Sequence, residues 1–392
     1  MFSSLFLQFE DPNRPFLGPI LKYLSFWGLW LPDGFRNKCF AILIQLLETI
    51  FITTEFLDIF YVKTDLNLVL TNLKFSMQGV INICKAWSLI FWQKDWRNVC
   101  EYVTRADLEN RRSKDPQQEE VVRKFTRYSR KVTYMFCALS YATAFVVIFQ
   151  PAFKYLLSPK YRENTKDGTE DYMEVVSSWV PFDKHKMPGY FFACVIQAFG
   201  TLLACAWITS YDMIALSVMI FIRLELESIR IDCATIFDEN DGDIVLDRIK
   251  RCHRRHVELI RCCRLYNSCS SPILMLYTFI CTVMLCATAH QINMETNKMQ
   301  QMMTLIYLIF GISQLFLYCW HSNDVYYASM ALATGPYESK WWSQNASKQR
   351  SIYILVGQLS KLIIFTAGPF TNLTVATFIN ILRGAYSYYT LL

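Results

Sequence analysis

Long apolar blocks separated by short polar stretches dominate the chain. A helix that spans a membrane needs about 20 predominantly apolar residues. Seven blocks approach or exceed this length: Phe40–Tyr61, Leu66–Trp92, Val132–Phe153, Pro188–Ile222, Pro272–Ile292, Met302–Trp320 and Leu373–Leu392. The pattern therefore predicts an all-α membrane protein with seven transmembrane helices.

Two polar stretches outside these blocks keep a helical period. In Ile244–Leu265, seven residues recur at spacings of two to four: Ile244, Leu246, Ile249, His253, Val257, Ile260 and Arg264. Such spacing predicts an amphipathic helix that extends beyond the membrane. A second helix is expected over Ser351–Phe365, and Gly368 with Pro369 should end it before the last block.

The last block carries its small and polar residues on one side. Thr374, Thr377, Asn380, Gly384, Ser387 and Leu391 follow spacings of three and four residues. A polar face on a spanning helix must contact protein or water. Two interpretations stay open. The face could pack against its own bundle, or it could line an axial pore with other subunits, where Leu391 would form a dewetting constriction.

Composition and charge agree with a membrane protein. Hydrophobic residues make up 53% and charged residues 18%, whereas soluble domains average roughly 45–50% and about 25%. Disordered and collagen-like chains are excluded, no nucleic-acid partner is expected, and a soluble enzyme is disfavoured. Alternate loops hold 28 and 8 lysines and arginines. Because the richer side is usually cytoplasmic, the N-terminus should lie inside and the C-terminus outside.

This orientation is opposite to that of a G-protein-coupled receptor. The Asp/Glu-Arg-Tyr and Asn-Pro-x-x-Tyr motifs of that class are also missing. A metabotropic seven-helix receptor is therefore the second interpretation, and a transporter, which would show repeated broken helices, is the third. The sequons at Asn345 and Asn372 fall on the expected cytoplasmic side and should remain unmodified.

Ionisable residues inside the spans face a partner or a cavity, because charge is costly in a bilayer. Glu55 and Lys74 lie at similar distances from the turn near Thr64, so we expect them to form an ion pair.

A group of cysteines and histidines in the fourth loop matches no standard zinc spacing. Its members are Cys252, His253, His256, Cys262 and Cys263. We therefore expect no metal, no cofactor and no enzymatic activity.

The C-terminal region resembles that of insect odorant receptors. The resemblance rests on Phe365-Thr-Ala-Gly-Pro-Phe and on the stretch from Phe378 to Leu392. Leu317-Tyr-Cys-Trp-His-Ser-Asn-Asp, Glu338-Ser-Lys-Trp-Trp and Trp179-Val-Pro-Phe-Asp are similar to further segments of that family. The related gustatory receptors, whose ending differs after Ser387-Tyr388, are an alternative. The chain lacks the enlarged second cytoplasmic loop of the co-receptor, which favours a ligand-tuning subunit.

The resemblance implies an odorant-binding subunit of a ligand-gated, non-selective cation channel. Its partners would be the co-receptor in a heterotetramer, a small volatile odorant (aromatic in view of the 16% aromatic residues), membrane lipid and permeant cations. Its place would be the plasma membrane of olfactory sensory neurons. The expected parts are a cytoplasmic arm (1–39), six spans with the pocket (40–322), a cytoplasmic linker and inter-subunit anchor helix (323–365) and a pore-lining seventh span (366–392).

The resemblance also places the odorant pocket in the outer half of the bundle, where it should be apolar with a few polar groups. The candidate pocket residues are Leu73, Met77, Val80, Cys137, Tyr141, Ala144, Ile148, Phe192, Ile196, Gln197, His290 and Tyr307. The candidate pore and gate residues are Asn380, Gly384, Ser387, Thr390 and Leu391.

Overall fold

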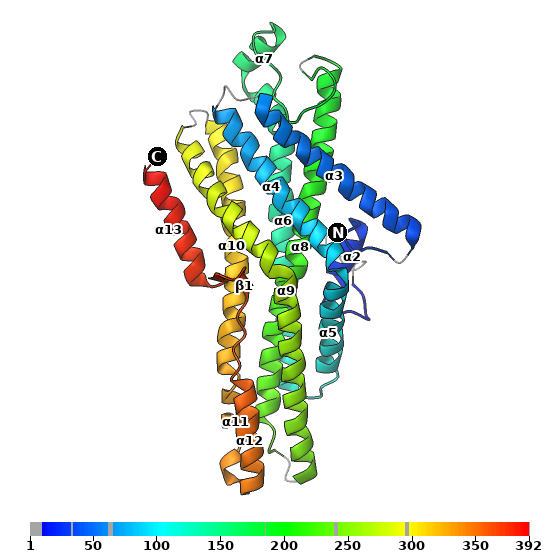
Figure 1. Ribbon diagram of the computed structural model, residues 1–392, viewed down its shortest axis with the longest axis vertical. Coiled ribbons are helices and arrows are strands. Elements are labelled where there is room, and N and C mark those ends of the chain that lie inside the picture. Colours follow the sequence, from blue (N-terminus) through cyan, green and yellow to red (C-terminus); the bar gives the residue numbers. More distant parts are fainter. Residues whose placement is uncertain are drawn as a thin grey trace.

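Figure 1 shows the computed structural model, which describes residues 10–32, 34–61, 66–184, 186–238, 242–294 and 298–391. For a few residues beside these gaps and near the C-terminus, only the backbone is described. The long helices are α3 (Phe35–Tyr61), α4 (Leu66–Phe91), α5 (Gln93–Arg111), α6 (Pro116–Leu157), α8 (Gly189–Ala234), α9 (Gly242–Met294), α10 (Lys298–Ala331), α12 (Ala346–Leu359) and α13 (Val375–Leu391). The short elements are α2 (Gly18–Phe26), α7 (Pro159–Lys166), α11 (Thr334–Glu338), the 3₁₀ turn η1 (Trp341–Ser343) and the strands β1 (Thr366–Ala367) and β2 (Thr371–Asn372).

All seven predicted segments are helical, and the predicted all-α membrane architecture is confirmed. Within the described residues, five helices are long and apolar enough to cross a membrane: α3, α6, α8, α9 and α10. The other two segments are α4, whose apolar run contains Asn72, Lys74, Asn82 and Lys85, and α13, which has 17 residues. Large apolar side chains such as Phe145, Phe199 and Phe279 are exposed on the outside of the bundle, as expected for surfaces that contact lipid.

The molecule is elongated along its helices (Figure 1). The end that carries α7 is a bundle of α3, α4, α6, α8, α9 and α10. The opposite end consists of the lower parts of α8, α9 and α10 with α11 and α12, while α5 lies beside the bundle below α2. At 46 and 53 residues, α8 and α9 are far longer than a membrane requires. The predicted extension beyond the membrane is therefore present.

The amphipathic stretch and the fifth span form one continuous helix, α9, although Pro272 was expected to begin a separate span. Proline is tolerated inside such helices where neighbouring groups satisfy the freed backbone. The face predicted for the lower part of α9 is partly wrong. Ile244, Leu246 and Val257 are exposed. The buried face consists of Val245, Ile249, Cys252, His256, Leu259 and Cys263, because cysteine packs as a small hydrophobe.

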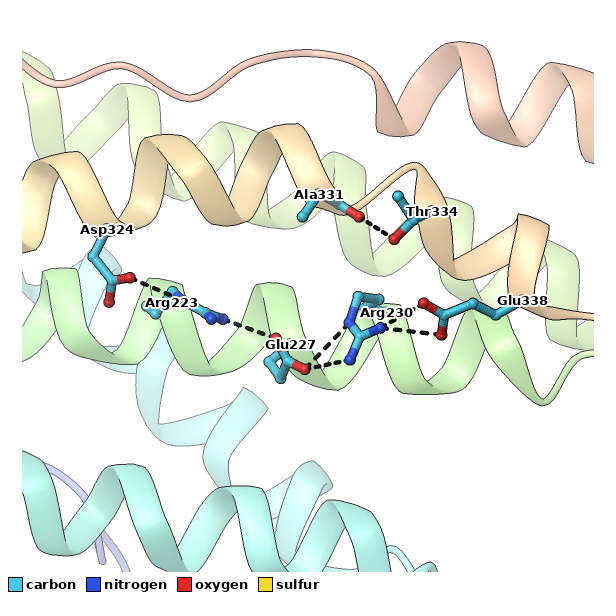
Figure 2. A network of polar contacts seen from close by, with 7 residues as sticks. All are labelled: Arg223, Glu227, Arg230, Asp324, Ala331, Thr334 and Glu338. Carbon is cyan, nitrogen blue, oxygen red and sulfur yellow. Dashed lines mark hydrogen bonds and ion pairs between the residues drawn. The ribbon is translucent and has the colours of Figure 1, made fainter.

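Charged residues join the lower helices (Figure 2). On α8, Glu227 lies between Arg223 and Arg230, at 3.0 Å and 2.8 Å. Arg223 also contacts Asp324 of α10 at 3.4 Å, and Arg230 contacts Glu338 of α11 at 2.8 Å. The network therefore ties α8 to α10 and α11.

The connection to α13 differs from the expected helix over Ser351–Phe365. Here α12 begins earlier, because the Asn345 side chain caps it by accepting a hydrogen bond from the Lys348 N–H at 3.0 Å. It ends at Leu359, and residues 361–365 belong to no helix or strand. The expected break at Gly368 is confirmed, since this residue has φ of +69° in the turn between β1 and β2.

Candidate ligand cavity and terminal helix

A cavity of about 100 Å³ lies among α3, α4, α6, α8 and α10, in the half of these helices nearer α7. Its walls are Glu48, Phe51, Ile52, Glu55, Phe75, Gln78, Gly79, Asn82, Ser140, Thr143, Ala144, Val147, Val176, Thr201, Ala204, Cys205, Ile208, Tyr307 and Phe310. The walls are mainly apolar, and several polar side chains point into a space that the chain itself does not fill.

The segment between α7 and α8 forms the roof. Val176 lines the cavity, and the fully buried Gln197 on α8 accepts a hydrogen bond from the Val175 N–H at 3.2 Å and donates one to the Ser178 hydroxyl at 3.0 Å. Lys184 contacts Asp58 and Glu174, each at 3.0 Å. These contacts hold the segment against α3 and α8.

Some polar groups of the cavity have no hydrogen-bond partner among the described residues. They are Glu48 Oε1, Gln78 Nε2, Asn82 Oδ1 and the Tyr307 hydroxyl. Buried polar groups are normally paired, and leaving one unpaired costs about 1–3 kcal/mol. Such groups are available to hydrogen-bond a ligand or water in the cavity.

The last helix, α13, stands at the periphery, and its C-terminal end points toward the end of the molecule that carries α7 (Figure 1). One face packs on α9 and α10: the Phe378 ring meets Phe316 with centroids 5.5 Å apart, and Ala385 is buried beside Cys286. The hairpin at its foot is fixed to α9, where Asn267 accepts a hydrogen bond from the Thr366 N–H at 2.9 Å, and Ser271 accepts one from the Gly368 N–H at 2.9 Å.

The polar face of α13 is directed away from these contacts. Asn380 and Ser387 are exposed, and a side chain added at Gly384 would meet no atom within 4 Å. Thr374 and Thr377 instead cap the start of the helix, where the Thr377 hydroxyl donates to the Asn372 carbonyl at 2.7 Å. The side chains of Thr390 and Leu391 lie outside the described part of the chain.

Comparison with known proteins decides the family. The family model for the seven-transmembrane odorant receptor matches residues 65–386, which is most of the chain. The chain belongs to the odorant receptor family. Odorant receptor 10 of Aedes albopictus is 22% identical over 86% of this chain and 87% of its own length. Odorant receptor 30a of Drosophila melanogaster is 19% identical over 98% of both chains.

Solved structures share the fold of this odorant receptor. The insect olfactory receptor OR5 from Machilis hrabei in complex with eugenol matches with a TM-score of 0.82 at 16% identity, over 98% of both chains. A second structure of the same Machilis hrabei receptor also matches with a TM-score of 0.82. The resemblance drawn from the C-terminal motifs is thereby confirmed at the level of the family.

The structure brings two of the predicted pocket residues of the receptor, Ala144 and Tyr307, into the cavity wall. The others lie elsewhere: Leu73, Met77, Val80, Cys137 and Ile148 are half-buried outside the cavity wall, the Tyr141 hydroxyl bonds that of Tyr23, and Gln197 holds the roof. Phe192 and Ile196 are 57% and 47% exposed on α8. The side chain of His290 lies outside the described residues.

Sequence reasoning missed the polar lining on α4. Gln78 and Asn82 are four residues apart and share one face of an apolar span. That spacing was a usable signal, because polar groups inside a span face a partner or a cavity.

The expected ion pair between Glu55 and Lys74 is not among the contacts of the described residues. Glu55 lines the cavity, whereas Lys74 lines a smaller adjoining one of about 40 Å³. Tyr307 borders both cavities, and the Lys74 ammonium lies 5.7 Å from the centre of its ring.

Among the described residues, Lys85 and Asp212 do form an ion pair, at 2.5 Å and with both side chains fully buried. Asp212 also accepts hydrogen bonds from Gln314 and from the Tyr318 hydroxyl, the latter at 2.5 Å. The Lys85 ammonium lies 4.9 Å from the centre of the Tyr277 ring. Lys85, Asp212 and Gln314 follow the cavity-lining Asn82, Ile208 and Phe310 by three or four positions. The cluster therefore lies one helical turn from the cavity on α4, α8 and α10.

Proposed function

We propose that this odorant receptor is the ligand-tuning subunit of a heteromeric, ligand-gated, non-selective cation channel. A small volatile odorant binds in the cavity, and binding opens a pore lined by the α13 helices of several subunits. One observation carries the channel: Asn380 and Ser387 on α13 are exposed and directed away from their own bundle. A polar face on a spanning helix needs protein or water, and an axial pore supplies both.

The cavity supports the odorant part of the proposal. Its walls include the rings of Phe51, Phe75 and Phe310 and a few polar groups that lack partners among the described residues. This composition is typical of sites for small molecules. The Machilis receptor of the same fold was solved in complex with eugenol, which is consistent with a small volatile ligand here.

Helix α10 is the physical connection between the cavity and the pore helix. Tyr307 and Phe310 line the cavity, and Phe316, less than two turns further along, packs against Phe378 of α13. A ligand that shifts α10 would therefore move the helix on which α13 rests. We propose that this contact transmits ligand binding to the pore.

The remaining assignments concern assembly and location. We propose the co-receptor as the partner subunit, with residues 323–365 as the inter-subunit anchor. Tyr353 and Ile354 of α12 are 58% and 65% exposed, and exposed apolar residues outside the lipid are typical of protein interfaces. The arm 1–39 would be cytoplasmic, 40–322 would carry the pocket, and 366–392 would form the pore in the plasma membrane of olfactory sensory neurons.

Cysteine accessibility during odorant-evoked whole-cell current tests the pore. In cells that also express the co-receptor, with G-protein signalling blocked, we expect a charged thiol reagent to reduce the current of Ser387→Cys severalfold. The matched variant Phe378→Cys, which faces α10, should resist the reagent. Equal sensitivity of both variants, or insensitivity of Ser387→Cys despite a normal current, would reject α13 as the pore lining.

A further inference from the structure

Two carboxyl groups enter the cavity from α3. Glu48 and Glu55 are seven residues apart, so they lie on the same face of the helix. Their exposed fractions are 3% and 6%, and both line the cavity. Glu48 Oε1 has no hydrogen-bond partner among the described residues. Both carboxyl groups are therefore shielded from bulk water, and both face the cavity and not the packed core.

Neither carboxyl group takes part in an ion pair within the part of the chain that the structure describes. The buried cation on α4, Lys74, lines the adjoining cavity against Tyr307. The next buried cation, Lys85, is already paired with Asp212. A buried carboxylate is costly unless a cation or several donors compensate it. Among the described residues, no cation compensates Glu48 or Glu55, so a positively charged ligand would.

Close helix packing holds the carboxyl groups in this place. A Cβ atom at Gly79 of α4 would lie 2.7 Å from Ile52, and one at Gly200 of α8 would lie 2.5 Å from the Phe51 ring. The two glycines let α3 approach α4 and α8 at the level between Glu48 and Glu55. The acidic face of α3 is thus built into the site and does not belong to a mobile surface.

The rest of the lining suits a cation with a short apolar body. The faces of aromatic rings attract ammonium groups, and Phe51, Phe75 and Tyr307 all line the cavity. Asn82 Oδ1 is a further acceptor without a described partner. An ammonium group has three donors and no acceptor, and so complements this set of acceptors.

We propose that the cavity takes a small protonated primary amine, whose ammonium group donates hydrogen bonds to the carboxylates of Glu48 and Glu55. Its aliphatic chain lies against Phe51, Phe75 and Tyr307. A cavity of about 150 Å³ accommodates benzene, whose ring has about six non-hydrogen atoms, so this smaller one of about 100 Å³ suits a ligand of about four. The proposal rests on the proposed function in that it takes this cavity as the odorant site.

Three ligands of nearly equal size test the ligand class: propylamine, 1-propanol and acetic acid. Their binding to the purified full-length chain in lipid nanodiscs is measured by titration calorimetry. We expect the amine to bind at least about tenfold more tightly than the alcohol, because hydrogen bonds between charged groups are about twice as strong as neutral ones. Alcohol or acid binding as tight as that of the amine, or no binding of the amine, overturns the proposal.

Three substitutions locate the contact. Glu48→Gln and Glu55→Gln should each lower the preference for the amine over the alcohol about tenfold, and should leave alcohol binding unchanged. Glu101→Gln, at an exposed position on α5, should change neither. An unaltered preference in both cavity variants overturns the proposed contact. The comparison of ligands on the unmodified chain does not depend on whether a variant folds.

The two proposals fail in different ways. A chain that binds propylamine but passes no current with the co-receptor would keep the ligand class and reject the channel. A receptor whose current responds to 1-propanol and never to propylamine would keep the channel and reject the ligand class.

Discussion

At the scale of single residues, a buried ion pair connects helices of the receptor beside the cavity. Lys85 and Asp212 are both fully buried, and Asp212 accepts hydrogen bonds from three residues on two helices. Taking both charges out of water is expensive, and their attraction offsets the cost only when the remaining lone pairs are also satisfied. Here they are, so the cluster joins α4, α8 and α10 next to the cavity.

Removing one partner of this pair should be more damaging than removing both. Asp212→Leu leaves the Lys85 ammonium buried and unpaired, and we expect a loss of about 3–5 kcal/mol. Lys85→Met combined with Asp212→Leu should recover most of that loss. Thermal unfolding followed by size-exclusion chromatography in detergent measures both effects. A double variant less stable than Asp212→Leu alone would contradict this account.

At the scale of elements, the hairpin of β1 and β2 determines where α13 stands. The Thr366 and Gly368 N–H groups donate to side chains of α9, and Phe365 is buried with its ring 5.1 Å from that of Tyr266. Gly368 permits this contact, because it has φ of +69° and a Cβ there would lie 2.3 Å from the Met275 sulfur. The foot of α13 is therefore tied to α9 through backbone geometry that only glycine adopts without strain.

Gly368→Ala should disconnect the cavity from the pore. A positive φ and a backbone shift away from Met275 together cost on the order of 1–3 kcal/mol, which should displace α13 while leaving the cavity intact. We expect odorant-evoked current to fall at least about tenfold, with ligand binding retained. Gly357→Ala on α12, where an added Cβ would meet no atom within 4 Å, is the control. A normal current in Gly368→Ala would show that the hairpin does not position α13.

At the scale of the whole molecule, the charged network of α8, α10 and α11 and the cavity lie at different ends of the bundle. The α7 end carries the roof and the cavity, and α11 and α12 occupy the opposite end with their charged network (Figures 1 and 2). The C-terminal end of α13 points toward the α7 end. The charge bias of the loops then predicts that the α7 end is extracellular.

Antibody access to epitope tags tests this orientation. A tag at the C-terminus should be stained on intact cells, and a tag at the N-terminus only after permeabilisation. Asn345, which caps α12, and Asn372 in β2 should carry no glycan, since both would lie on the cytoplasmic side of the membrane. The reverse staining pattern would support a metabotropic receptor and reject the proposed channel.

The sequence by itself determined which segments are membrane helices, because burial in lipid demands long apolar runs and closed backbone hydrogen bonding. The α9 extension, the break at Gly368 and the odorant receptor family also follow from local pattern and motifs. The cavity did not, because its lining comes from five helices whose relative rotation no single period reveals. Ala144 and Tyr307 were predicted, whereas the acceptors at Glu48 and Asn82 became a site only when α3 and α4 met.

The polar face of α13 shows the same division. Its spacing of three and four residues is visible in the sequence, yet that spacing fits a bundle contact and a pore equally well. Only the tertiary structure places Phe378 and Ala385 against α9 and α10 and leaves Asn380 and Ser387 exposed. The reason is physical: periodicity defines the two faces of a helix, and the packing of its neighbours decides which face is buried.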